Sequence, residues 1–245
     1  MPFRKWSSFW SGRPSRRQPI RRNPLSFERL ETRDVPALIF DPLLNYSFPG
    51  GKDLFVPLDA LDTDGNAITY SVTSDNAQVS AGIVAGGTTI KLNVSGKDGN
   101  GTDFTGDLYL RLFDSLAPGA VAQIVELTND DFYNGREFHR VIEGFMAQGG
   151  SANGTGSGAS GKGEFDDEFN PALAFVSPGV LAMANAGDDS NDSQFFIVDP
   201  DNSLATLPQH LNYNHTIFGL LVGGFATFDK IMSTDVEAQS AQNPE

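Results

Sequence analysis

The stretch from residue 138 to residue 150 reads Phe-His-Arg-Val-Ile-Glu-Gly-Phe-Met-Ala-Gln-Gly-Gly. It places one arginine, Arg140, among apolar residues, with a glutamine, Gln148, eight positions later. If the chain bends at Gly144, the alternation of side chains along a strand puts four residues on one face: Arg140, Ile142, Met146 and Gln148. A permanently charged guanidinium beside apolar side chains is costly unless it has a role. An isolated arginine of this kind usually forms an ordinary salt bridge, but this one is followed by further motifs.

Four other blocks accompany this stretch in a fixed order. They are Phe132-Tyr-Asn-Gly135, Val180-Leu-Ala-Met-Ala-Asn-Ala-Gly187, Ser193-Gln-Phe-Phe-Ile197 and Leu211-Asn-Tyr-Asn-His-Thr-Ile-Phe-Gly219. Together they resemble the cyclophilin family of peptidyl-prolyl cis–trans isomerases, over residues 105–231. The resemblance implies a mainly β fold: a closed antiparallel β-barrel with two covering helices. It also implies that the chain catalyses rotation about X–Pro peptide bonds.

The resemblance further implies a set of site residues. Arg140 matches the catalytic arginine of the family, and Gln148 matches the glutamine that orients the arginine and the substrate. The proline pocket is matched by four apolar residues, whose ordinary place in a protein is the core: Phe145, Met146, Phe196 and Leu211. The segment whose backbone pairs with the bound peptide is matched by Ala184 and Asn185. His139 matches the histidine of the motif, and His215 matches the histidine at the edge of the pocket.

Rotation about an amide breaks no bond, so this chemistry needs no metal and no cofactor, and none is expected. The run Gly156–Gly163 lies one residue from a phosphate-binding P-loop, but Gly163 stands where that loop needs Ser or Thr. The three histidines also lack the spacing of a zinc site. His210 stands where many family members carry tryptophan, which leaves cyclosporin sensitivity open.

Composition sets limits on the class of protein. Residues 1–36 contain nine Lys and Arg residues and three acidic residues, a net charge of +6. Residues 37–245 contain eight Lys and Arg residues and 28 acidic residues, a net charge of −20. The acidic body repels phosphates, which argues against nucleic acid as a partner. Cysteine is absent, and no apolar run approaches the ~20 residues of a membrane span.

Three regions are predicted along the chain. Residues 1–36 form a basic leader expected to be disordered, and residues 27–37 resemble a segment of bacterial proteins with extracellular β-domains, which favours export or the cell surface. Residues 37–100 are predicted to form a small β-sandwich, similar to cadherin- or immunoglobulin-like modules, from three strands: 54–58, 68–72 and 90–94. Residues 101–245 form the cyclophilin-like domain, which ends before the last strand of the family's barrel.

Two helices are expected within that domain. Pro118 suits a first helical turn, and Val121, Ile124 and Val125 follow on one face. The second helix is expected at residues 225–232 from its apolar spacing.

Three functions follow from these patterns. The first is a prolyl isomerase that acts on proline-containing peptides and on unfolded or flexible protein segments, and so assists folding. The second is a catalytically weak, cyclophilin-like peptide-binding module on an exported or surface protein. The third is an adhesion or display protein in which the β-module carries the function. The oligomeric state is left open by the sequence.

Overall fold

The structure is a computed structural model, and it describes residues 38–40, 53–58, 60–62, 67–84, 86–199 and 207–234. The predictions for the leader and for the chain after residue 234 lie outside these ranges. None of the helices within them is long and apolar enough to cross a membrane.

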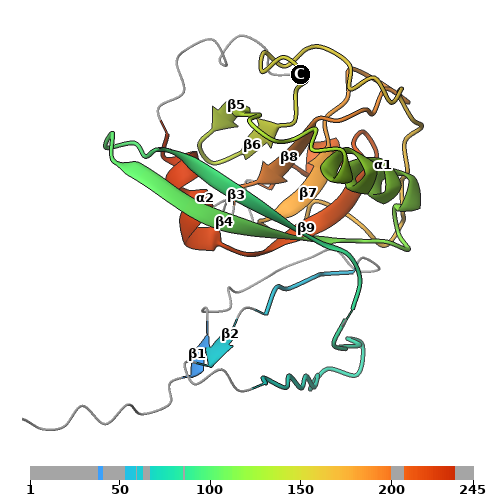
Figure 1. The fold of residues 1–245 in the computed structure, drawn as a ribbon. Coiled ribbons are helices and arrows are strands. Elements are labelled where there is room, and N and C mark those ends of the chain that lie inside the picture. The colour runs from blue at the N-terminus through green and yellow to red at the C-terminus, as the bar shows by residue number, and fades with distance from the viewer. Residues whose placement is uncertain are drawn as a thin grey trace, which may run out of the picture. The chain divides into compact units, whose positions relative to one another are not determined.

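Seven antiparallel strands form the main sheet, in the order β3-β4-β9-β7-β8-β6-β5 (Figure 1). Their bounds are β3 Thr89–Lys97, β4 Asp103–Leu112, β5 Phe138–Ile142, β6 Met146–Gly149, β7 Val180–Met183, β8 Phe195–Val198 and β9 Ile217–Gly223. Two helices, α1 Pro118–Asn129 and α2 Phe225–Met232, accompany the sheet, together with a short 3₁₀ turn, η1 Gln209–Leu211. The mainly β class and both predicted helices are confirmed.

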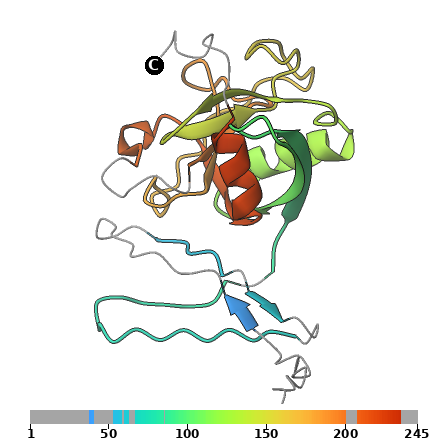
Figure 2. The ribbon, with the colours of Figure 1, turned by 90° about the vertical axis from the view of Figure 1, so that its left-hand side faces the viewer.

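The sheet curls into a half-barrel (Figures 1 and 2). Its edge strands are β3 and β5, and no strand among the described residues joins them. The predicted closed barrel is therefore not found within these residues, because closure requires every strand to pair on both sides.

The predicted β-sandwich of residues 37–100 is not supported. Two of its three expected strands, at 54–58 and 68–72, are irregular segments of half-buried and exposed residues. The third, at 90–94, lies inside β3, which pairs with β4 along its full length from Thr89↔Arg111 to Lys97↔Asp103. The proposed boundary between residues 100 and 101 thus falls in the turn between two paired strands. Among the described residues of this region, β1 Leu38–Phe40 also pairs with β2 Ala60–Asp62.

The central strands are buried on both faces. Every residue of β7 and β8 is buried, and alternate residues belong to two different apolar clusters. Phe195 and Ile197 pack with both helices, whereas Phe196 and Val198 pack on the other face with Phe175. Burial on both faces explains why these strands are continuous apolar runs in the sequence rather than alternating ones.

The first turn of α1 is capped from a distant part of the chain. Pro118 is at its start, and Ala117, the residue before it, has no side chain able to cap. The Glu168 carboxylate instead accepts hydrogen bonds from the backbone N–H of Gly119 (3.0 Å) and of Ala120 (2.8 Å). A negative charge at this position also interacts favourably with the helix dipole.

Candidate active site

The β5–β6 hairpin builds the first part of the site. Arg140 is the register partner of Gln148, and Ile142 is the partner of Met146. Directly opposed residues of an antiparallel pair share one face, so the predicted grouping of these four side chains is confirmed. The bend between the strands falls at Gly144, whose φ of 72° is in the left-handed region that favours glycine.

The register extends this row into the neighbouring strand. Gln148 of β6 is opposite Phe196 of β8, so the guanidinium, the amide and the aromatic ring come from three adjacent strands on one face. The Arg140 Nη1 donates a hydrogen bond to Gln148 Oε1 over 3.3 Å. The sheet thereby places a cationic donor next to an apolar surface.

A second glutamine, Gln194, continues the network and was missed among the predicted site residues. Gln148 Nε2 donates to Gln194 Oε1 over 3.1 Å, and Gln194 Nε2 donates to the carbonyl of Gly156 over 3.0 Å. The hydrogen bonds thus run from Arg140 through both glutamines to the loop that follows β6. The only sequence signal was the position of Gln194 beside Phe195 and Phe196 in one of the motif blocks.

Burial affects the pKa and the hydration of the Arg140 guanidinium. Its side chain is half-buried, and desolvation lowers the pKa of the guanidinium. The ordinary pKa of arginine is so high that the group stays protonated at neutral pH. Partial desolvation therefore leaves a permanent cation that is less hydrated than one on the open surface, which strengthens any hydrogen bond that it donates.

An apolar patch adjoins this donor. Met146, Phe196 and Leu211 are buried, with 1%, 4% and 7% of their surface exposed, and Phe145 packs against the same cluster while keeping part of its surface open. The Phe196 ring is stacked on Phe175, with centroids 5.8 Å apart. All four predicted pocket residues therefore lie in one cluster.

His215 packs against the edge of this cluster. Its ring meets the Phe196 ring edge-on, with centroids 5.5 Å apart and planes at 90°. The Nδ1–H donates to the Met183 carbonyl over 3.0 Å, since a carbonyl can only accept. Burial lowers the pKa of His215, which favours the neutral ring beside this cluster.

The predicted peptide-pairing segment follows β7. The Ala184 N–H donates to the carbonyl of Gln194 over 2.9 Å, and both residues are half-buried. The Asn185 side-chain amide donates to Asp167 Oδ1 (3.3 Å) and to the carbonyl of Asn214 (2.9 Å). Asn185 thus fixes the segment between β7 and two neighbouring loops.

His139 lies in a break in the β5–β6 register, between the pairs formed by Phe138 and Arg140. Both of its ring nitrogens are buried, without a hydrogen-bond partner among the described residues. Burial lowers the pKa of this histidine. A side chain at Gly156 would come within 3.4 Å of its Nε2, so the loop after β6 covers this ring.

Metal binding has no support in this part of the chain. The described residues contain no group of three or more His, Asp or Glu side chains arranged to hold a metal ion. What the arrangement offers chemically is a cationic hydrogen-bond donor beside an apolar cluster.

A half-barrel with two helices and a cationic donor beside an apolar cluster agrees with the cyclophilin-like domain that the sequence resembles. Residues 99–245, more than half of the chain, match the family model described as cyclophilin type peptidyl-prolyl cis-trans isomerase/CLD. The chain belongs to this family.

Individual relatives agree with this assignment. Peptidyl-prolyl cis-trans isomerase-like 1 of Homo sapiens is 41% identical over 137 residues, which cover 55% of this chain and 78% of the relative. Peptidyl-prolyl cis-trans isomerase A of Mycobacterium tuberculosis is 46% identical over 132 residues, covering 48% of this chain and 69% of the relative. Relatives thus come from both eukaryotes and bacteria, so they do not establish the bacterial origin that the resemblance of residues 27–37 suggests.

Among solved structures, a cyclophilin type peptidyl-prolyl cis-trans isomerase of Cryptosporidium parvum, crystallised in the presence of the dipeptide Ala-Pro, is 37% identical with a TM-score of 0.47. The match covers 52% of this chain and 79% of that one.

Proposed function

We propose that this isomerase catalyses rotation about X–Pro bonds in unfolded or flexible protein segments, with Arg140 as the catalytic residue. The observation that carries the proposal is the row of Arg140, Gln148 and Phe196 across three adjacent strands. This row supports the proposal because a cationic donor and apolar side chains are what the reaction requires.

The physical task is to lower a barrier of ~18–20 kcal/mol that arises from the double-bond character of the amide. When the amide twists, its nitrogen becomes pyramidal and gains a lone pair that accepts a hydrogen bond. A donor aimed at this nitrogen binds the twisted amide more tightly than either planar form, which is the requirement for acceleration. The Arg140 guanidinium, held by Gln148, is suited to this role because it needs little reorganisation.

The other site residues receive roles that fit their positions. Phe145, Met146, Phe196 and Leu211 would receive the proline ring, and His215 would close the edge of the pocket. The backbone around Ala184 and Asn185 would pair with the bound peptide. His139 would support the Arg140 strand from beneath the covering loop.

Replacing Arg140 with alanine tests this proposal. We expect the Arg140→Ala chain to lose about 10²-fold or more in kcat/KM towards an uncharged Ala-Pro peptide, the magnitude typical of removing one transition-state donor. Exchange spectroscopy or protease-coupled kinetics would measure the rate, with peptide affinity measured in parallel. An Arg140→Ala chain that isomerises the peptide as fast as the parent would overturn the assignment.

One observation favours a second candidate, a peptide-binding module with weak catalysis. The described sheet is open between β3 and β5, and an open sheet holds its outer face less rigidly than a closed barrel. Catalysis depends on the donor position more strongly than peptide affinity does. Saturable peptide binding by a folded parent without rate enhancement would identify this alternative.

A further inference from the structure

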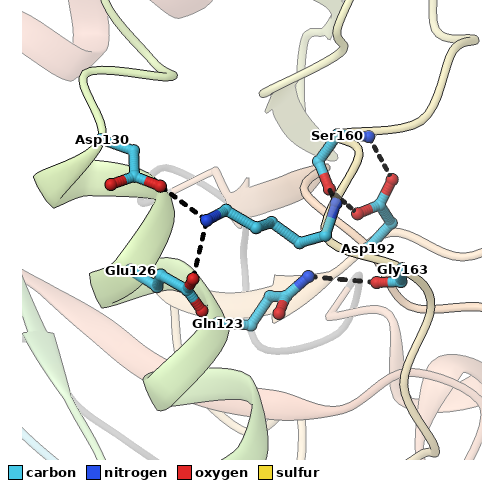
Figure 3. Close-up of polar contacts among 7 residues, drawn as sticks. Gln123, Glu126, Asp130, Ser160, Gly163 and Asp192 are labelled. Atoms are coloured by element: carbon cyan, nitrogen blue, oxygen red, sulfur yellow. Dashed lines mark hydrogen bonds and ion pairs between the residues drawn. The ribbon is translucent and has the colours of Figure 1, made fainter.

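The loop after β6, residues 151–163, ends in a clamp on α1 that lies outside the site described above (Figure 3). The Lys162 Nζ lies 2.7 Å from Glu126 Oε1 and 2.6 Å from Asp130 Oδ2. One turn earlier on the same helix, Gln123 Nε2 donates to the carbonyl of Gly163 over 3.1 Å. Three side chains on successive turns of α1 thus hold two neighbouring residues of the loop.

The Lys162 ammonium also separates two like charges. Glu126 and Asp130 are four residues apart on one helix face, where two carboxylates repel each other. Lysine is protonated at neutral pH, and the hydrogen bonds of Asp130 and Glu126 raise the pKa of Lys162 further. Without the Lys162 ammonium, nothing in the clamp would offset the repulsion between the Glu126 and Asp130 carboxylates.

The clamp connects to the segment that carries Gln194. The Lys162 N–H donates to the Ser160 hydroxyl oxygen over 3.1 Å, and that hydroxyl donates to the Asp192 carboxylate. The Ser160 N–H also donates to Asp192 Oδ2, over 2.6 Å. Asp192 lies two residues before Gln194, so the loop end and the motif block are fixed to each other.

An earlier part of the same loop contacts the site, because the Gly156 carbonyl accepts the hydrogen bond from Gln194. Five glycines of this loop adopt positive φ: Gly154, Gly156, Gly158, Gly161 and Gly163. Hydrogen bonds among Ser151, Asn153 and Ser157 hold its first half, whereas its second half is held by the contacts with Asp192 and α1 described above. A glycine-rich segment has many conformations to lose on ordering. Contacts at the end of the loop therefore act together with the local hydrogen bonds around Ser151 to place the Gly156 carbonyl.

We infer that Lys162 is a positioning residue for the isomerase: its ion pairs with α1 fix the loop that holds Gln194, and through Gln148 they restrain Arg140. Lys162 itself does not touch the substrate site. Because the clamp is an exposed ionic contact, dissolved salt weakens it, and the activity of the chain becomes sensitive to ionic strength. The inference rests on the proposed isomerase activity.

The test compares Lys162→Met with the parent, with Lys162→Arg and with Lys97→Met. Lys97 forms an exposed ion pair with Asp103 (2.5 Å) between β3 and β4, so Lys97→Met removes the same charge outside the clamp. An uncharged Ala-Pro peptide avoids any effect of salt on substrate attraction. Thermal melting of each variant checks that it is folded.

We expect Lys162→Met to lower kcat/KM about twofold to fivefold, the scale of an exposed ionic network, and to do so mainly through kcat. The parent should lose a similar factor between low and high salt, while Lys162→Met should be nearly insensitive to salt. Lys162→Arg should restore both properties, and Lys97→Met should behave as the parent. Equal activity of Lys162→Met and the parent, or an equal loss in Lys97→Met, would overturn the inference.

A readout without catalysis separates this inference from the proposed function. The Gly156 backbone N–H donates to the Ser151 hydroxyl oxygen over 3.1 Å, and its hydrogen exchange reports the order of the loop. Faster exchange in Lys162→Met than in the parent and in Lys97→Met supports the clamp even if the parent is inactive. Unchanged exchange contradicts the clamp whatever the activity is.

Discussion

Gln148 stands between the guanidinium of Arg140 and the amide of Gln194, so replacing it with leucine separates the donor from the rest of the network. The Gln148→Leu side chain has nearly the same size but neither accepts from Arg140 nor donates to Gln194. Both lost contacts are side-chain hydrogen bonds between half-buried groups. The variant therefore tests the support of Arg140 without removing Arg140 itself.

The size of the effect follows from the two bonds. The bond from Arg140 is charge-assisted, a type worth about 1.5–3 kcal/mol, and its length of 3.3 Å places it at the lower end. The bond to Gln194 is neutral and worth about 1 kcal/mol. If both act on the position of the donor, about 2.5 kcal/mol is lost, which corresponds to a fall of about 70-fold in kcat/KM.

The same two hydrogen bonds also contribute to stability, because the values above are net of exchange with water. We expect the free energy of unfolding to fall by no more than about 2.5 kcal/mol. Isomerisation of an Ala-Pro peptide and urea denaturation would measure the two quantities. Gln78→Leu, the same change at an exposed loop position, is the matched control.

A fall in kcat/KM of less than about threefold in a folded Gln148→Leu chain would refute this reasoning, since so small a change corresponds to less than about 1 kcal/mol. The donor would then be held by other contacts. A fall of equal size in Gln78→Leu would show that the assay responds to the substitution type rather than to the network.

Two further predictions concern the scaffold. Glu168→Gln keeps one acceptor oxygen but removes the charge and the second acceptor at the start of α1, so urea denaturation should show a loss of about 1–2 kcal/mol, whereas an unchanged midpoint would contradict the cap. Burial lowers the pKa of His215 below its ordinary 6.5, so the unfolded chain binds more protons as the pH falls below about 6.5. This contribution to stability is complete above that pH and is lost as the pH falls through the folded-state pKa, and His215→Gln should show a smaller decline in unfolding midpoint between about pH 7.5 and pH 5 than the parent shows.

The sequence predicted those parts of the molecule that depend on local periodicity. Apolar residues at helical spacing, such as Val121 and Ile124, predicted α1, and strict alternation around Gly144 placed Arg140 and Gln148 on one face. Both patterns are set by backbone geometry within a few residues. The proposed pocket residues came from the family resemblance. The sheet register places Met146 and Phe196 on one face, whereas Leu211 joins their cluster from η1 and Phe145 from the β5–β6 turn.

Contacts between residues far apart in the sequence could not be predicted from local periodicity. Gln194 joins the network because β6 pairs with β8, and Lys162 meets α1 because a loop folds back over the helix. Nothing in the local sequence of either residue specifies its partner. The alternation of apolar and polar residues at 68–72 predicted a strand that the structure does not contain. Alternation alone is not sufficient, because a strand also requires a neighbouring strand with which to pair.

The capping of α1 by Glu168 has a consequence for the order of events during synthesis. The cap lies 49 residues after Gly119, and ribosomes add about 5–20 residues per second, so it is made about 2–10 s after the helix that it completes. A segment of 12 residues is short for a helix that must persist alone in water. We therefore expect α1 to lack its cap, and to be incompletely formed, until the chain beyond β6 has been synthesised.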